Sequence, residues 1–266
     1  MDLSLIPFIL SGVLITSILS GIVGMAGEAL LLVILSFTLL PFQQTAMLYA
    51  TALFFACASR AFIHRKHLHL PGMEYFFVGL LFAAFIFGPL PGIAIDKGAQ
   101  DLLLGTGQAL LGVAFFIPFF SRGKFKPDFT RRPQALLCAV LTAGFKSIDN
   151  RGFLLNLFFQ DIPMTRYEVI STKAAAQLIP YLIVIAHAGS AVSSDMSAEL
   201  PWVCVAVAVT AVLGSYLGKR VLQKITDAQF YHATRIILWL MGAIYLWEAS
   251  SLITQALPEL QAMQKT

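Results

Sequence analysis

Charged side chains are scarce in this sequence. Lys, Arg, Asp and Glu make up 12% of its 266 residues, whereas 58% are hydrophobic, and the mean hydropathy is +0.79. A soluble domain carries about 25% charged residues, so the composition excludes an ordinary soluble domain. Because a membrane-spanning helix needs about 20 apolar residues, the long apolar runs predict an all-α integral membrane protein.

Cysteine is rare as well, with three residues in the chain. Cys57, Cys138 and Cys204 lie far apart inside apolar segments, which predicts packed small side chains and neither disulfides nor a metal site. Three histidines between residues 64 and 69 lie in a basic loop without Cys or carboxylate neighbours. We therefore expect a solvated loop there and not a metal centre.

Motifs of catalysis are missing too. The sequence has no nucleophile–base pair and no phosphate-binding loop, so we expect neither an enzyme nor a bound cofactor. The pI near 9.0 does not predict nucleic-acid binding, because the basic residues lie in loops between apolar segments. The amino-terminal stretch has no Lys or Arg, which a secretory signal would need, so the apolar run from Leu3 is expected in the mature fold.

The basic residues that do occur predict the orientation of the chain. Three short loops, one after residue 59, one at 121–133 and one at 219–229, hold eleven of the 18 Lys and Arg residues. By the positive-inside rule these three loops face the cytoplasm. The loops 96–101 and 188–199 carry acidic residues and a single Lys between them, so they are expected outside.

Two apolar stretches must then return to the side from which they start. The stretch 134–159 follows a cytoplasmic loop and precedes a segment that also starts in the cytoplasm, so it is predicted to be a re-entrant hairpin. The stretch of about 5–40, broken at Gly21–Glu28, is predicted to be a hairpin entered from outside. The predicted full crossings are 42–59, 73–95 and 102–120 in the first half and 165–187, 200–218 and 230–250 in the second.

The two halves are weakly similar. Pro41 and Pro163 each open the first full crossing of their half, and this offset of 122 residues aligns the two breaks. We predict two inverted repeats, each a broken hairpin followed by three transmembrane helices, at 1–121 and 134–266, with a cytoplasmic basic linker at 122–133. Eight full crossings, with each hairpin counted as one long bent helix, are the alternative.

Charge is concentrated at the tip of the second hairpin, where two cations and one carboxylate lie within six residues. Charges at that depth in a membrane are costly and mark functional sites. A broken helix also exposes backbone N–H groups and a dipole that favour an anion. The residues expected to bind substrate at this tip are Lys146, Ser147, Asp149, Asn150, Arg151 and Asn156. The alternative is a structural ion-pair cluster that closes the hairpin.

Three further site residues lie outside that tip. Lys173 is expected level with the hairpin tips, because it lies about 12 Å into its segment at about 1.5 Å per residue. Gly27 and Glu28 belong to the first break and are expected to contact the substrate as well. Glu28 has two interpretations, as a counter-ion to a lysine or as a proton carrier.

Several loose motifs occur together in this chain. They are Gly24-Met-Ala-Gly-Glu-Ala-Leu-Leu-Leu, Pro41 through Ala50-Thr51-Ala52, Pro163 through Ser171-Thr172-Lys173, and Gly214 with Gly218. With these motifs, nearly the whole chain resembles the sulfite exporter TauE/SafE family of bacterial membrane proteins. It departs from the family pattern at both breaks, where other residues interrupt or replace the runs of glycine.

The resemblance implies a secondary transporter of the bacterial inner membrane with several transmembrane helices. It would export sulfite or an organosulfonate such as sulfoacetate by alternating access, with the substrate held at the midplane between the two hairpin tips. The count of basic loops separately predicts that both termini are periplasmic. The expected partners are the sulfur oxyanion, the lipid bilayer and, as an open alternative, a second copy in a homodimer. The competing function is transport of another small anion, a carboxylate, with proton coupling.

Overall fold

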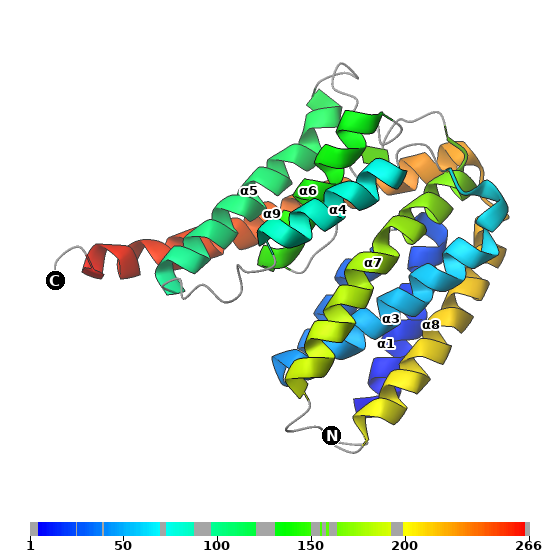
Figure 1. The fold of residues 1–266 in the computed structure, drawn as a ribbon, viewed down its shortest axis with the longest axis horizontal. Coiled ribbons are helices and arrows are strands. Elements are labelled where there is room, and N and C mark those ends of the chain that lie inside the picture. Colours follow the sequence, from blue (N-terminus) through cyan, green and yellow to red (C-terminus); the bar gives the residue numbers. More distant parts are fainter. Residues whose placement is uncertain are drawn as a thin grey trace. The chain divides into compact units, whose positions relative to one another are not determined.

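The computed structural model describes residues 5–24, 26–38, 40–69, 73–87, 97–120, 131–149, 155, 158–159, 164–192 and 199–263. All regular structure among these residues is helical (Figure 1). The chain divides into two compact units, and each takes segments from both halves of the sequence. Unit 1 comprises Met1–Leu70 and Pro163–Thr234, and unit 2 comprises Pro71–Ile162 and Arg235–Thr266.

The helices are divided between the two units. Unit 1 contains α1 (Leu5–Val23), α2 (Ala26–Ser36), α3 (Phe42–Ile63), the 3-10 helix η1 (Arg65–His67), α7 (Arg166–Val192), α8 (Leu200–Leu222) and the start of α9 (Asp227–Met263). Unit 2 contains α4 (Met73–Phe87), α5 (Lys97–Phe120), α6 (Arg132–Asp149) and the remainder of α9.

Five helices in the described part of the chain are long and apolar enough to cross a membrane. Their candidate spans are Leu5–Val23, Gln43–Ile63, Arg166–Ala186, Leu200–Leu222 and Asp227–Thr254. The prediction of an all-α membrane protein is therefore confirmed, whereas the inverted repeats and the boundaries of the two predicted repeats stay predictions.

Several predicted loop boundaries were wrong. The helix α5 begins at Lys97, so Asp101 lies in a helix and not in the expected loop. The helix α8 continues to Leu222, so Lys219 and Arg220 form its last turn. Cations at a helix carboxyl terminus interact favourably with the helix dipole, which explains why the helix continues through these basic residues.

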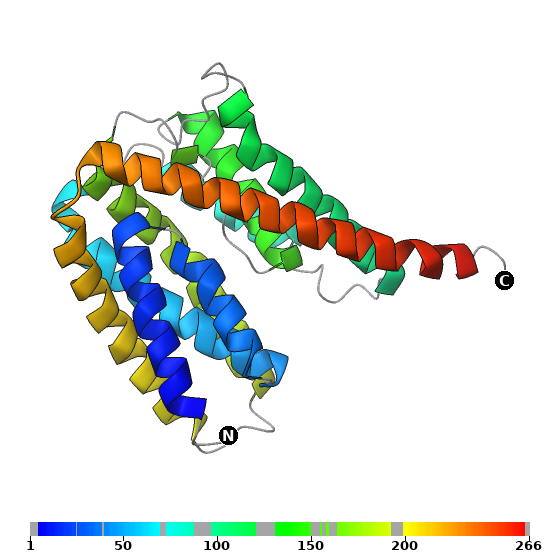
Figure 2. The same ribbon diagram turned by 180° about the vertical axis from the view of Figure 1, so that it is seen from behind.

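The first hairpin is present in unit 1. Gly12 of α1 lies against Ile34 of α2, and Gly27 of α2 lies against Thr16 of α1, so the two helices run antiparallel (Figure 2). With 11 residues, α2 is about 16 Å long and too short to span a bilayer core of about 30 Å. The chain therefore turns back at the predicted break.

The tip of this hairpin lies near one end of unit 1 and not at the expected mid-depth. Ser20 lies beside Arg60, three residues before α3 ends, and Gly21 lies beside Gly218, four residues before α8 ends. The reason is the length of α1, whose 19 residues reach about 28 Å at about 1.5 Å per residue.

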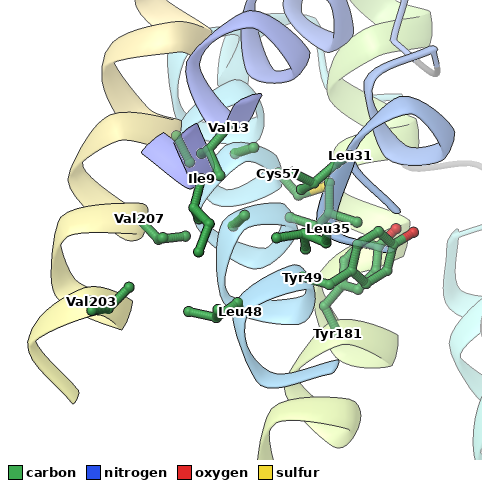
Figure 3. Packing of buried hydrophobic residues seen from close by; sticks show 14 of the residues in the cluster. Ile9, Val13, Leu31, Leu35, Leu48, Tyr49, Cys57, Tyr181, Val203 and Val207 are labelled. Atoms are coloured by element: carbon green, nitrogen blue, oxygen red, sulfur yellow. The ribbon is translucent and has the colours of Figure 1, made fainter. Parts of the chain in front are cut away.

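The core of unit 1 lies between α1, α2, α3, α7 and α8. Its buried side chains include Ile9, Val13, Leu31, Leu35, Leu48, Tyr49, Tyr181, Val203 and Val207 (Figure 3).

A Cβ added to Gly218 of α8 would lie 2.7 Å from the carbonyl oxygen of Ile18, and one added to Gly214 would lie 2.6 Å from the Cβ of Ser17. The two glycines therefore allow α8 to pack closely against α1.

Candidate anion-binding site at the first helix break

The break between α1 and α2 is made by Gly24. Its φ of 79° lies in the left-handed region that glycine adopts without strain. The Gly24 N–H donates a hydrogen bond of 2.8 Å to the carbonyl oxygen of Ser20. The helix α2 begins two residues later, and the first N–H groups of any helix lack partners within it. The break therefore presents the positive end of a helix dipole inside unit 1.

The side chain of Lys173 reaches this break from α7. Its Nζ atom lies 3.7 Å from the position that a Cβ on Gly24 would occupy. The residue is 1% exposed, and its ammonium group interacts with the charges of Glu28 and Arg60. The ammonium thus lies at the amino terminus of α2, where it adds a full positive charge to the helix dipole.

A second buried cation, Arg60, reaches the same break from α3. Its Nη1 donates a hydrogen bond of 3.0 Å to the Ser20 carbonyl, and its Nε donates one of 3.1 Å to the Ala56 carbonyl. Its Nη2 lies 3.1 Å from the sulfur of Cys57. All three hydrogen bonds go to neutral acceptors, so none of them compensates the charge of the guanidinium.

The carboxylate of Glu28 is fully buried in the first turn of α2. The side-chain amide of Gln177 donates a hydrogen bond of 3.2 Å to its Oε2 atom, and the thiol of Cys57 lies 3.6 Å from the Gln177 carbonyl oxygen. The hydroxyl of Tyr181 interacts with the same carboxylate. These contacts connect Arg60 to Glu28 through two neutral side chains.

Two tyrosine side chains lie next to Glu28, because Tyr181 interacts with its carboxylate and Tyr49 contacts Tyr181. Tyr49 of α3 and Tyr181 of α7 meet edge to face, with ring centroids 6.3 Å apart (Figure 3). Both side chains are buried, and their hydroxyl groups point the same way in Figure 3. Lys173, Gln177 and Tyr181 follow one another at four-residue spacing, so α7 presents all three on one face.

The described site has an excess of positive charge. Two cations, Lys173 and Arg60, lie around the break with one carboxylate, Glu28, so their formal charges sum to one positive charge. An isolated charge away from water is costly unless it is paired. An anion of one charge at the amino terminus of α2 would neutralise the group.

The structure brings together three of the residues predicted to bind substrate, namely Gly27, Glu28 and Lys173. Gly27 also has a packing reason to lack a side chain, because a Cβ there would collide with the carbonyl oxygen of Thr16. The side chains of Lys146, Ser147 and Asp149, and the whole of Asn150, Arg151 and Asn156, lie outside the described residues. Their role in binding stays a prediction.

Sequence reasoning missed Arg60 and Gln177. Arg60 was assigned to the basic loop after residue 59, which was wrong, because α3 continues to Ile63 and buries the guanidinium. The three apolar residues 61–63 after Arg60 were the signal for this longer helix. The signal for Gln177 was its spacing of four residues from Lys173 on the same helix.

The expectation of a solvated histidine loop was wrong for His64. Its ring is 6% exposed and lies 5.3 Å, centroid to centroid, from that of Tyr167. Burial, with the nearby charges of Lys219, His67 and Arg60, lowers the pKa of His64 to about 4. Within the part of the chain that the structure describes, no group of three His, Cys, Asp or Glu residues is placed to hold a metal ion.

Comparison with known proteins gives one match. No curated protein and no solved structure matches the chain. A family model described as sulfite exporter TauE/SafE matches residues 8–245, which include both the break and the α7 face that carries Lys173. With most of its length matched, the chain belongs to the sulfite exporter TauE/SafE family of membrane transporters.

Proposed function

We propose that this chain is a secondary transporter that exports a small sulfur-containing anion, sulfite or an organosulfonate such as sulfoacetate, by alternating access. The observation that carries the proposal is the pair of buried cations, Lys173 and Arg60, placed with the single carboxylate of Glu28 at the start of α2. Membership of the TauE/SafE family supports a sulfur-containing substrate.

A sulfite or sulfonate group suits the donors at the break. Its oxygens would accept hydrogen bonds from the first N–H groups of α2 and from the ammonium of Lys173. The hydroxyl of Ser20 is buried and finds no hydrogen-bond partner among the described residues, so it supplies a further donor. Arg60 holds the Ser20 carbonyl, which also accepts from Gly24, and thereby fixes the geometry of the break.

The proposed inverted repeats are supported by one packing relationship in each unit. In unit 1, Gly214 of α8 lies against Leu14 and Ser17 of α1. In unit 2, Gly79 of α4 lies against Leu136 and Ala139 of α6. Leu14 and Ser17 precede Leu136 and Ala139 by 122 residues, the offset that relates Pro41 to Pro163, whereas the two glycines that contact them are 135 residues apart.

The proposal includes an orientation in the bacterial inner membrane. The end of unit 1 near the break carries η1 and the last turn of α8, both basic, so the positive-inside rule places it in the cytoplasm. Both termini are then periplasmic. A binding site that lies near the cytoplasmic end is accessible to an anion produced inside the cell, as export requires.

A second candidate function is transport of a small carboxylate with proton coupling. The observation that favours it is the complete burial of Glu28 beside Gln177 and Tyr181, since a buried carboxylate is suited to accept a proton. The two candidates differ in the anion bound and in the part that Glu28 plays.

The anion that stabilises the purified protein tests the proposal. A ligand that binds only the folded protein adds about 2.7 kcal/mol at a concentration 100 times its dissociation constant. Melting temperatures should be measured with sulfite, sulfate, thiosulfate, sulfoacetate, taurine and small carboxylates. We expect sulfite or sulfoacetate to raise the melting temperature of the wild type and of Lys224→Gln, an exposed control, but not of Lys173→Gln. Stabilisation by carboxylates alone would favour the second candidate and contradict the first.

A further inference from the structure

A basic cavity lies at the end of unit 1 where α3 ends and η1 begins. Its volume is about 550 Å³, and its lining residues are Phe62, Ile63, His64, Arg65, Lys66, His67, Tyr167, Tyr216, Lys219 and Gln223. Three of these residues are permanently cationic, and none of the described lining residues is Asp or Glu. The cavity therefore favours an anionic occupant.

An apolar groove of about 570 Å³ adjoins this cavity. It lies between α1 and α8 and is lined by Leu14, Leu213, Tyr216, Leu217, Lys219, Arg220 and Gln223. Three residues, Tyr216, Lys219 and Gln223, line both the cavity and the groove, so the two lie next to each other. Leu213 is 55% exposed and Leu217 is 42% exposed, so this side of the groove belongs to the surface of the protein.

The groove continues the outer apolar face of α8. Val209 and Val205, about one and two turns before Leu213, are both exposed, and Trp202 is exposed near the other end of the helix. A face of this composition on a spanning helix contacts the acyl chains of lipids. The cavity at its basic end lies in the last turn of α8, which is the level of the phospholipid headgroups.

We propose that the cavity and the groove together bind one anionic phospholipid, with its phosphate held by Arg65, Lys66 and Lys219 and an acyl chain along Leu213 and Leu217. Charge complementarity supports the headgroup position, because basic residues near an anionic membrane surface each contribute about 1 kcal/mol to binding. The shape supports a lipid over a free anion, because only a lipid uses both the basic cavity and the apolar groove. Tyr216, with an apolar ring and a polar hydroxyl, suits the boundary between headgroup and acyl chain.

Two neighbouring residues, Phe62 and His64, affect the charge that this ligand would meet. The guanidinium of Arg65 lies 4.9 Å from the centroid of the Phe62 ring, whose side chain is exposed, so the charge is held against an apolar surface. The pKa of His64 is lowered to about 4, so its ring is neutral near pH 7 and can accept or donate a single hydrogen bond without adding charge. The binding charge is therefore that of the three permanent cations.

The test uses the full-length protein in a neutral detergent, with binding measured by native mass spectrometry against phosphatidylglycerol, phosphatidylcholine and inorganic phosphate. We expect phosphatidylglycerol to bind most tightly, and Lys219→Gln to weaken it about fivefold, the equivalent of about 1 kcal/mol. Leu217→Trp, which fills the groove, should also weaken it. Lys224→Gln, five residues further along and in neither lining, should leave it unchanged.

Three results would overturn the inference. Equal binding of phosphatidylglycerol and phosphatidylcholine would show that the three cations do not select an anionic lipid. Displacement of phosphatidylglycerol by millimolar phosphate or sulfite would make the cavity a site for free anions. Unchanged binding in both Lys219→Gln and Leu217→Trp would mean that the lipid binds at another site. The lipid comparison is made on the wild type, so it tests the inference even where a variant folds poorly. The anion-dependent melting assay of the proposed export function measures binding at a different site, the break around Lys173.

Discussion

The side-chain amide of Gln177 donates a hydrogen bond of 3.2 Å to the carboxylate of Glu28, across 149 residues of sequence. The two side chains come from α7 and α2, and both are buried. Lys173, one turn before Gln177 on the same face of α7, places its ammonium at the adjacent break. One face of α7 thus orients the carboxylate of the site and supplies one of its two cations.

The coupling between Gln177 and Glu28 is measurable. Gln177→Leu removes a donor to a buried carboxylate, and hydrogen bonds to charged groups contribute about 1.5–3 kcal/mol. We expect Gln177→Leu to lower the melting temperature clearly in the wild type but much less in a Glu28→Gln background, as a double-mutant cycle would show. Equal effects in both backgrounds would mean that the two side chains do not interact.

Arg60→Lys keeps the charge of Arg60 but not its hydrogen bonds. A lysine cannot reproduce the planar arrangement of donors that binds the carbonyls of Ser20 and Ala56. We expect this variant to lower affinity for sulfite or sulfoacetate about tenfold, equivalent to about 1.4 kcal/mol, as measured by anion-dependent melting. Arg65→Lys, at an exposed position, is the matched control. Unchanged affinity in a well-folded Arg60→Lys protein would leave Arg60 without a role in the site.

Gly218→Ala tests the close packing of α8 on α1. The added Cβ would lie 2.7 Å from the Ile18 carbonyl oxygen and 2.9 Å from the Gly21 Cα, both backbone atoms that cannot move aside cheaply. Overpacking of this kind costs about 1–3 kcal/mol, so the melting temperature should fall. The control Val209→Leu adds volume at an exposed position of the same helix and should have little effect. A Gly218→Ala protein as stable as the wild type would contradict this packing.

The lowered pKa of His64 predicts that the stability of the protein depends on pH. Burial first, and then the neighbouring cations, lower its pKa to about 4 from an ordinary value of 6.5. The unfolded chain therefore takes up the proton first as the pH falls. Stability is complete above pH 6.5 and decreases between about 6.5 and 4, with a loss of about 2 kcal/mol between pH 7 and pH 5.

We expect His64→Gln to reduce this decrease, measured as the difference in melting temperature between pH 7 and pH 5. His69→Gln is the control, because the described contact of His69 is a backbone hydrogen bond to Thr172 that the substitution retains. If wild type and His64→Gln lost the same stability on acidification, His64 would not be the responsible group.

The sequence predicted the parts of the site that carry an unusual residue type. Glu28 and Lys173 stand out because they are ionised residues inside apolar runs, and the cost of burying them pointed to function. Arg60 was not predicted as a site residue, because it precedes two other basic residues and was counted with their loop. Gln177 was not predicted either, because neutral polar residues are common in packed helices. Its role in the site follows from its hydrogen bond to Glu28.

The apolar pattern predicted where most of the described helices lie, but it did not predict the residues at which they end. The break after α1 lies within the predicted stretch Gly21–Glu28, because glycine interrupts the apolar run at Gly24. The carboxyl end of α8 was placed too early, because basic residues were taken as a loop signal although they also suit the last turn of a helix. The depth of the first tip depended on where α1 starts relative to the other helices, which no local pattern specifies.

The central claim is that the protein exports a small sulfur-containing anion through the site around Lys173, and efflux from proteoliposomes tests it most directly. An inside-negative potential favours exit of an anion by about 2.3 kcal/mol per charge per 100 mV, so export needs no coupled proton. Vesicles containing the protein should be loaded with sulfite or sulfoacetate and exposed to a voltage, a pH gradient or both.

We expect voltage alone to drive efflux through the wild type and through Glu28→Gln, and Lys173→Gln to abolish it while Lys224→Gln retains it. Efflux that continues in Lys173→Gln would contradict the site. Efflux that ignores voltage, follows the pH gradient and stops in Glu28→Gln would contradict voltage-driven export and make Glu28 the proton carrier.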